Sequence, residues 1–374
     1  MQTTVDAIGN VRGVFPASKE PAHRVVLGSH LDTVPNAGAF DGILGVVVAI
    51  AAVEALGGPL PFSIEIVGFS EEEGIRFRKP FLGSLAAVGQ LTPETLALTD
   101  ADGASISSAI THFGLNPDRV GAARFGAETT AYLEIHIEQG PVLETLRWSA
   151  AAHANAESER SVLGVVESIV GQSRVALRFQ GLANHAGTTP MHLRHDALAA
   201  AAEWITDVER VARERDGLVA TVGQLTVEPG APNVIPGLVS TTLDIRHAED
   251  SVRKEALERL VGSAAAAATA RGVRLTYETT LDQPAVQMDT DLVRYLKKAV
   301  ARAGHVPHAM ASGAGHDAMI VAPHVPSAML FVPSPEGLSH HPDESVHPRD
   351  VEAALDATLE FLQLLSEDDR FLNA

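Results

Sequence analysis

The sequence predicts an α/β protein in which a mostly parallel sheet forms a larger domain and a smaller α+β domain interrupts it. A strand-like run that ends at His30 is followed by a helical run over 42–56 and a second strand-like run over 62–70. Strand, helix and strand in succession favour a parallel sheet. From about residue 163 the pattern changes to β-α-β-β-α-β, which is typical of a ferredoxin-like unit. After about residue 283 a helix and a strand resume the first pattern.

These changes of pattern place the domain boundaries. We expect residues 1–165 and 284–374 to form the two parts of the larger domain, and residues 166–283 to form the inserted domain.

Each expected element has a local signal. Residues 5–15 indicate two short strands around the turn signal Gly9-Asn10, and the helix over 42–56 ends at the stop signal Gly57-Gly58. A further strand covers 130–140, "TAYLEIHIEQG". The remaining expected elements are strands over 164–181, 218–230, 238–247 and 327–334 and helices over 196–214, 252–272 and 291–304.

Composition excludes several classes of function. The formal net charge of -19, from 28 basic and 47 acidic residues, repels nucleic acid and anionic membranes. The longest apolar run is too short to span a membrane, and the first residues lack the basic-then-apolar plan of a signal peptide. We therefore expect a cytoplasmic protein. The chain has 16 His and 0 Cys, so any transition-metal site must use imidazoles and carboxylates.

Imidazoles and carboxylates recur near the ends of strand-like runs. A lone His is usually a core or surface residue, but the repetition favours convergence at one edge of the sheet, where ligands bind in open α/β folds. Such side chains suit Zn, Mn, Co or Ni, and a carboxylate can bridge two ions. The candidates are His30, Asp41, Glu72, Glu73, His136 and His340.

Two details suggest which of these residues bind metal, orient a ligand or transfer protons. Asp32 follows His30 by two positions, so in an extended loop its carboxylate could accept the other ring N–H of His30. The adjacent glutamates of "SEEEG" point in different directions, so one can bind metal while its neighbour handles protons. The alternative for this triplet is a solvated acidic turn.

Several motifs, spread in order over roughly residues 5 to 365, carry a resemblance to a known family. They are "GSHLDTV", "FDGILGV", "SEEEGIRF", "LEIHIEQGPVLE", "ANHAGTTPMHLRHDALAA", "EPGAPNVIPG", "SGAGHDA" and "GLSHHPDE". The sequence resembles the amidase, hydantoinase and carbamoylase branch of the M20 metallopeptidase-like family. That branch includes N-carbamoyl-L-amino acid hydrolases, allantoate amidohydrolases and β-ureidopropionases.

The resemblance implies an aminopeptidase-like catalytic domain with two divalent metal ions and an inserted dimerisation or lid domain. His30, Asp41 and His136 would hold one ion. Asp41, Glu73 and His340 would hold the other, with Asp41 as the bridge and His341 left outside. Glu72, the residue before the ligand Glu73, would be the general base.

The resemblance also implies how substrate is held in a homodimer. His185 would reach across from the partner subunit and stabilise charge on the substrate oxygen. Gln139 and Asn233 would donate hydrogen bonds, and His316 would shape the pocket floor. Arg246 is the best candidate for a substrate carboxylate because a guanidinium binds it bidentately, although a surface Arg at a strand end is the alternative.

These features lead to a functional hypothesis. We expect hydrolysis of the carbamoyl C–N bond of N-carbamoyl-L-amino acids, small ureido acids, with release of amino acid, CO2 and NH3. Allantoate is the alternative substrate, because it also offers a carboxylate and a carbamoyl group. An aminoacylase or dipeptidase on the same metal centre, and a non-catalytic metal-binding protein, remain open.

Two departures from the family pattern have consequences. Family members usually carry a helical segment before the region of "VDAIGN", where this sequence begins, so we expect sheet surface that such helices would cover to be exposed. The stretch 148–161 is longer and more irregular than in the family, and we expect a surface loop whose His153 is not a ligand.

Overall fold

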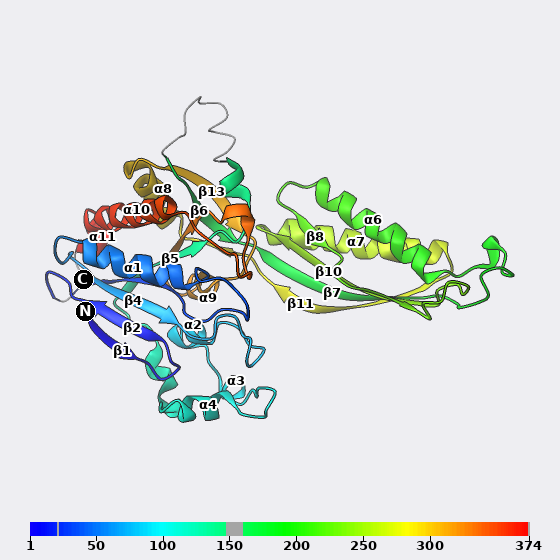
Figure 1. The fold of residues 1–374 in the computed structure, drawn as a ribbon, viewed down its shortest axis with the longest axis horizontal. Helices are drawn as coiled ribbons and strands as arrows, with labels where there is room; N and C mark the ends of the chain where they lie inside the picture. Colours follow the sequence, from blue (N-terminus) through cyan, green and yellow to red (C-terminus); the bar gives the residue numbers. More distant parts are fainter. Residues whose placement is uncertain (21, 147–159, 373–374) are drawn as a thin grey trace. The chain divides into compact units, whose positions relative to one another are not determined.

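The computed structural model describes residues 1–20, 22–146 and 160–372. The chain folds into two compact units (Figure 1). One unit comprises residues 1–169 and 287–374, and the other comprises residues 170–286. His153 and residues 148–159 of the predicted loop lie outside the described residues.

The first unit is built on a large sheet with the strand order β1-β2-β4-β3-β5-β14-β6-β12, and β13 pairs with β6. The central strands β4, β3, β5 and β14 are parallel to one another, which confirms the predicted mostly parallel sheet. The strands are β1 Gln2–Val5, β2 Val11–Phe15, β3 Arg24–His30, β4 Ser63–Phe69, β5 Thr129–Ile137, β6 Val162–Ile169, β12 Val286–Gln287, β13 Val306–Ser312 and β14 Ser327–Val332.

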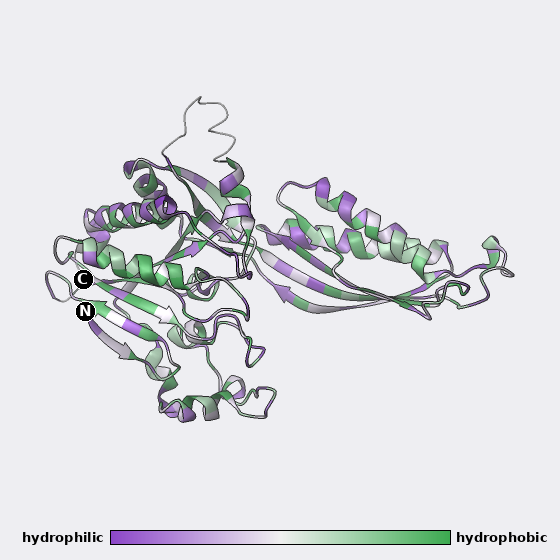
Figure 2. Cartoon of the chain, viewed as in Figure 1, coloured by the Kyte–Doolittle hydropathy of each residue, from purple (hydrophilic) through white to green (hydrophobic). Residues whose placement is uncertain are grey.

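The central strands are rich in apolar residues and are buried along most of their length, because both faces of the sheet are covered. Every residue of β4 is buried, and the pattern of β14 is the same. Helix α1, Ile43–Ala55, packs against β3, β4 and β5 and is hydrophobic over most of its surface (Figure 2). A Cβ atom on Gly45 would lie 1.9 Å from the carbonyl oxygen of Ile135, so only glycine allows this close approach.

The other helices of this unit include two long ones that pack against each other, α8 Thr290–Arg302 and α10 Pro348–Ser366. The sequence predicted α1 and α8 closely but assigned no helix to α10. It also missed the short elements between β4 and β5, which are too brief to show a periodic pattern. The remaining elements are α2 Leu82–Ala87, α3 Pro93–Leu96, α4 Ile106–His112, η1 Pro117–Ala123, α9 Asp317–Val321, η3 Pro335–Gly337 and α11 Asp369–Leu372.

The second unit is an antiparallel sheet with the order β11-β7-β10-β8, and β9 also pairs with β10. Its elements follow the predicted β-α-β-β-α-β order with two exceptions. The predicted strand over 164–181 divides into β6 of the first unit and β7 of the second, and 218–230 forms two short strands instead of one. The elements of the second unit are β7 Gly171–Gln180, η2 Met191–Leu193, α6 Ala197–Arg213, β8 Val219–Thr221, β9 Leu225–Glu228, β10 Leu238–His247, α7 Asp250–Ala270 and β11 Arg274–Gln283.

One face of this sheet packs on α6 and α7. Strand β10 alternates buried and partly exposed residues along its length, as a sheet covered on one face requires. The core joins Phe179, Trp204 and Leu260, and the indole Nε1 of Trp204 donates a 2.9 Å hydrogen bond to the carbonyl oxygen of Leu260. In the described part of the chain, no helix has both the length and the apolar character needed to cross a bilayer.

Candidate metal centre

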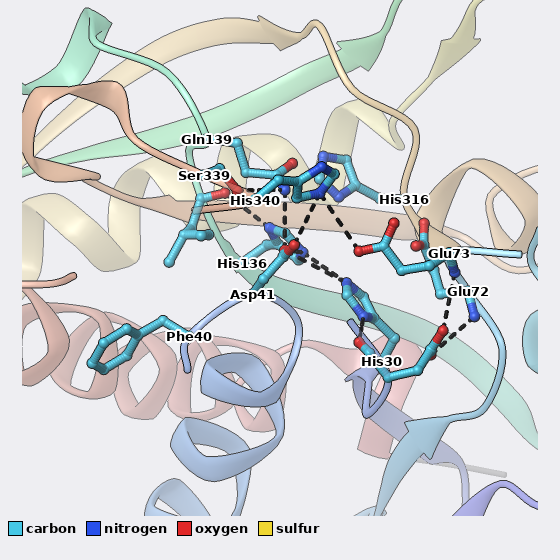
Figure 3. A network of polar contacts seen from close by, with 12 residues as sticks. His30, Phe40, Asp41, Glu72, Glu73, His136, Gln139, His316, Ser339 and His340 are labelled. Atoms are coloured by element: carbon cyan, nitrogen blue, oxygen red, sulfur yellow. Dashed lines mark hydrogen bonds and ion pairs between the residues drawn. The ribbon is translucent and has the colours of Figure 1, made fainter. Parts of the chain in front are cut away.

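The parallel strands of the first unit bring the predicted ligands to one edge of the sheet (Figure 3). His30 is the last residue of β3, and His136 lies one residue before the end of β5. Asp41 lies in the loop that leads into α1, and Glu73 follows β4. His340 lies in the loop after η3. The carboxyl ends of parallel strands meet at one edge, which is why residues so far apart in sequence converge.

The first group of candidate ligands is His30, Asp41 and His136, and all three side chains are buried. The Nε2 atoms of the two imidazoles are 3.1 Å apart. Oδ1 of Asp41 lies 3.2 Å from Nε2 of His136 and 3.8 Å from Nε2 of His30. Three donor atoms thus face a common point.

The second group is Asp41, Glu73 and His340. Nε2 of His340 lies 3.2 Å from Oδ2 of Asp41 and 3.5 Å from Oε1 of Glu73. The two carboxylate oxygens of Asp41 therefore face different groups, which is the arrangement a bridging ligand needs.

Two observations show that these residues fit divalent ions. Among the described residues, Oδ2 of Asp41 and Oε1 of Glu73 are buried and have no hydrogen-bond partner. Nδ1 of His30 lies 2.8 Å from the carbonyl oxygen of Asp32, and Nδ1 of His136 lies 2.9 Å from that of Ile137. Each ring therefore donates through Nδ1–H and leaves the Nε2 lone pair free for a metal.

Asp32 departs from one sequence-based expectation. Its backbone carbonyl, not its carboxylate, accepts the ring N–H of His30. The carboxylate turns toward the next loop, where it accepts hydrogen bonds from the backbone N–H groups of Glu72 at 3.0 Å and Glu73 at 3.1 Å. Asp32 thus orients both the imidazole and the pair of glutamates.

Burial and neighbouring charges shift the pKa values of the first group. Burial, reinforced by the charge of His136, lowers the pKa of His30 to about 4, so its imidazole is neutral near pH 7. Burial alone would raise the pKa of Asp41, but the hydrogen bond and charge of His136 outweigh it and lower that pKa. For His136, burial is likewise outweighed by Asp41, and the pKa is raised.

Glu72 lies beside the second group and is 7% exposed. Burial raises the pKa of its carboxyl well above the usual value, and the negative charges of Asp317, Glu73 and Glu134 raise it further. A carboxyl group with an increased affinity for protons suits acid–base chemistry.

Two further predicted residues surround the ligands. Nε2 of Gln139 donates to Oδ1 of Asp41 at 3.0 Å, so its amide supports a ligand directly. His316 is buried beside His136, with ring centroids 4.5 Å apart, and its Nε2 lies 2.9 Å from Oγ of Ser312. Burial, followed by the charge of His136, lowers the pKa of His316 well below its usual value.

The other predicted residues lie in the second unit. His185 and Asn233 are adjacent, because the backbone N–H of Ala186 donates to the carbonyl oxygen of Asn233 at 2.9 Å. Nδ1 of His185 accepts the backbone N–H groups of Gly187 and Thr188, so its exposed Nε2 carries the proton and is a donor.

Arg246 on β10 binds the carboxylate of Asp244 through paired hydrogen bonds. Its Nε donates to Oδ1 of Asp244 at 2.8 Å, and a terminal nitrogen donates to Oδ2 at 3.3 Å. Its guanidinium is therefore held in place by a neighbour on the same face of the strand.

The structure adds two residues to which the sequence assigned no role. Ser339 and Glu344 lie in the motif "GLSHHPDE", on either side of His340 and His341, and connect to Gln139 and Asp41. The predicted non-ligand His341 is outside both ligand groups. The only signal for Glu344 in the sequence is its position in the motif that contains His340.

Comparison with known proteins places this centre in a family. A sequence model described as Peptidase family M20/M25/M40 matches residues 26–364. The chain belongs to this family.

Relatives within the M20 family include proteins of the branch that the motifs indicated. The chain is 40% identical to an N-carbamoyl-L-amino acid amidohydrolase of Geobacillus stearothermophilus over 343 residues, which cover 91% of this chain and 81% of the relative. It is 36% identical to the allantoate amidohydrolase of Escherichia coli (strain K12) over 358 residues, with coverage of 94% and 83%. A crystal structure of a hydantoinase/carbamoylase family amidase from Burkholderia multivorans matches with a TM-score of 0.88 at 33% identity, covering 100% of this chain and 87% of the other. The resemblance stated from the motifs is confirmed.

Proposed function

We propose that this M20 family chain hydrolyses the carbamoyl C–N bond of N-carbamoyl-L-amino acids and releases the amino acid, CO2 and NH3. The chain is a hydrolase that acts on C–N bonds other than peptide bonds, like the amidohydrolases to which it is related. The observation that carries the proposal is the pair of ligand groups joined by Asp41, with the buried carboxyl of Glu72 beside them.

Two divalent ions would be held by the two groups. His30, Asp41 and His136 would bind one ion, and Asp41, Glu73 and His340 the other; Zn, Mn, Co and Ni all accept these ligands. Bound ions of this kind lower the pKa of a water molecule to about 7 and polarise a carbonyl oxygen.

Glu72 would be the general base and acid. Its carboxylate accepts a proton from the attacking water and later delivers it to the leaving nitrogen. This proton transfer to the nitrogen is needed because a ureido nitrogen is a poor leaving group as an anion. The backbone of Glu72 is held by Asp32, so its side chain starts from a fixed position.

Residues of the second unit would hold the substrate. In a ureido group two nitrogens donate into the carbonyl, so charge that develops on its oxygen needs strong stabilisation. The Nε2–H of His185, supplied by the partner subunit of a homodimer, would provide it. Arg246 would bind the carboxylate of the ureido acid, with Asn233 as a further donor and His316 at the pocket floor. Gln139 was also expected to donate to the substrate, but both of its amide N–H groups are directed at Asp41 and Ser339, so it would act by supporting Asp41.

Allantoate is the second candidate substrate. Relatives named allantoate amidohydrolase or allantoate deiminase match over most of the chain, at identities that include 36% and 37%. Both substrates offer a carbamoyl group and a carboxylate, so the proposed ligands and Arg246 serve either one.

A comparison of four substrates tests the proposal. Metal-reconstituted protein is assayed for ammonia with N-carbamoyl-L-methionine, its D-enantiomer and allantoate, and for free methionine with N-acetyl-L-methionine. We expect ammonia from the L-carbamoyl compound in preference to its enantiomer. Ammonia from allantoate alone would assign the same centre to ureide breakdown, and free methionine from the acetyl compound alone would indicate an aminoacylase.

A further inference from the structure

Glu344 is a buried carboxylate in the loop that carries His340. It is 4% exposed, and its own backbone N–H donates to the carbonyl oxygen of His341 at 3.0 Å, which closes a turn directly after His340. Its carboxylate is bound by hydrogen-bond donors from two separate loops, and one of those loops carries Asp41.

One oxygen of Glu344 holds the backbone of the Asp41 loop. Oε1 accepts the backbone N–H of Phe40 at 3.2 Å and that of Asp41 at 3.1 Å. The two loops are in tight contact here, because a Cβ atom on Gly38 would lie 2.3 Å from Cβ of Glu344. The position of the Asp41 backbone therefore depends on a side chain that is distant in sequence.

The other oxygen holds the residue before His340. Oε2 accepts the hydroxyl of Ser339 at 3.0 Å. Oγ of Ser339 in turn accepts from Nε2 of Gln139 at 3.1 Å, and the same nitrogen donates to Oδ1 of Asp41 at 3.0 Å (Figure 3). The hydrogen bonds thus form a closed ring that fixes Asp41 at both its backbone and its carboxylate.

His340 needs such support. Its φ of 55° lies in the left-handed region, which a residue with a side chain adopts only when its surroundings hold it there. The bond between Ser339 and Glu344 restrains the loop on the side where this conformation begins.

We propose that Glu344 is a positioning residue that sets the affinity of the centre for the ion between Asp41, Glu73 and His340. Two of these three ligands belong to loops that its carboxylate ties together. The other ion shares only Asp41 with them and takes its remaining ligands, His30 and His136, from strand ends. The proposal rests on the metal centre proposed above.

The test is a titration of metal-free protein with Mn²⁺ by calorimetry, repeated with Co²⁺ and visible absorption. For Glu344→Ala we expect one ion to bind about 10- to 100-fold more weakly than in the wild type, the loss typical when a group that orients ligands is removed. The Co²⁺ spectrum of that ion should change as well. Glu344→Gln keeps an oxygen for the N–H groups of Phe40 and Asp41 and should bind both ions nearly as the wild type does.

Asp289→Ala is the matched control. Asp289 also accepts two backbone N–H groups, those of Asp291 and Leu292, but it does so at the start of α8, which carries none of the proposed ligands. This variant should lose stability and keep both affinities. Ser339→Ala removes the hydrogen bond to Oε2 and the one from Gln139, but it keeps the bonds of Oε1 to Phe40 and Asp41. It should therefore weaken one ion by a smaller factor.

Wild-type affinity for both ions in Glu344→Ala would overturn the proposal, as would an equal loss of affinity in Asp289→Ala. If Glu344→Ala does not fold, unchanged affinities in Ser339→Ala decide against it. Failure of the wild type to bind any ion would instead overturn the proposed function.

Discussion

Nε2 of His30 lies 3.1 Å from Nε2 of His136, and the opposite nitrogen of each ring faces a backbone carbonyl oxygen. Two imidazoles so oriented point their Nε2 lone pairs toward each other. When both rings are neutral, this arrangement is unfavourable unless a metal ion or a proton lies between the two nitrogens. We interpret the pair as two ligands of one ion, completed by Oδ1 of Asp41.

The position of Glu72 beside the ligands predicts that its substitution lowers activity and leaves the bound metal in place. Glu72→Gln removes the group that carries the proton, so the rate of ammonia release should fall by about a hundredfold or more. Metal content, measured by mass spectrometry of the purified protein, should stay at the wild-type value. Glu71→Gln changes the preceding carboxyl, which is not part of either ligand group, and should retain activity. Equal activities in the two variants would remove Glu72 from the mechanism.

The proposed role of His185 predicts complementation between subunits. His185→Ala and Glu72→Gln should each be inactive alone. After mixing and exchange of subunits, heterodimers contain one complete site, so about a quarter of the wild-type activity should return. Activity of the mixture is measured as ammonia release after the subunits have exchanged. No recovery, with exchange shown by mass spectrometry, would contradict action across the interface.

The proposed role of Arg246 predicts that its substitution weakens substrate binding. Arg246→Lys keeps the charge but loses the paired donors, so KM for a ureido acid should rise by roughly tenfold or more, as loss of a charged hydrogen bond implies. The matched control is Arg174→Lys, because Nε of Arg174 also donates to Asp244, at 2.9 Å. KM should not change in that variant, and equal effects in both would show that only Asp244 had been disturbed.

The lowered pKa of His30 predicts how the metal-free protein responds to acid. The pKa falls from 6.5 to about 4 on folding, so between these values the unfolded chain binds a proton that the folded chain does not. Stability is therefore lost as the pH falls from 6.5 to 4, by up to roughly 3 kcal/mol at this one site.

His30→Asn removes this contribution together with the effects of His30 on Asp41 and His136, whereas the raised pKa of Glu72, which acts in the opposite direction, remains in both proteins. Urea unfolding of the two metal-free proteins, followed from pH 7 to pH 4, gives the difference. The wild type should lose more stability than the variant, and parallel curves would contradict the shift at His30.

The sequence predicted most of the elements that have a periodic or continuous apolar pattern, although it assigned no helix to the amphipathic α10. Strands β3 and β4 and helix α1 are long apolar runs, and they bring His30 and Glu73 to the same edge. Short helices such as α2 and α4 have no room for a repeat, and their positions follow from packing against the sheet.

Ligand types were predictable for a similar reason, whereas hydrogen-bond partners were not. Residues at the ends of parallel strands converge, which is why His30 and His136 could be expected to meet. The division of the ligands into two groups, which include the loop residues Asp41 and His340, was implied by the family resemblance. The direction of the Asp32 carboxylate depends on which backbone N–H groups the neighbouring loop presents. The contact between Glu344 and Asp41 joins loops that no local pattern connects.

In the proposed function, two ions bound at one Asp41-bridged centre make the chain active. The most direct test titrates metal-free protein with Mn²⁺ while the number of bound ions and the release of ammonia from N-carbamoyl-L-methionine are measured together. We predict that activity appears as the centre fills with two ions per chain, and that Asp41→Asn abolishes both binding and activity. Full activity of the metal-free protein in the presence of a chelator would contradict this role of the metal ions.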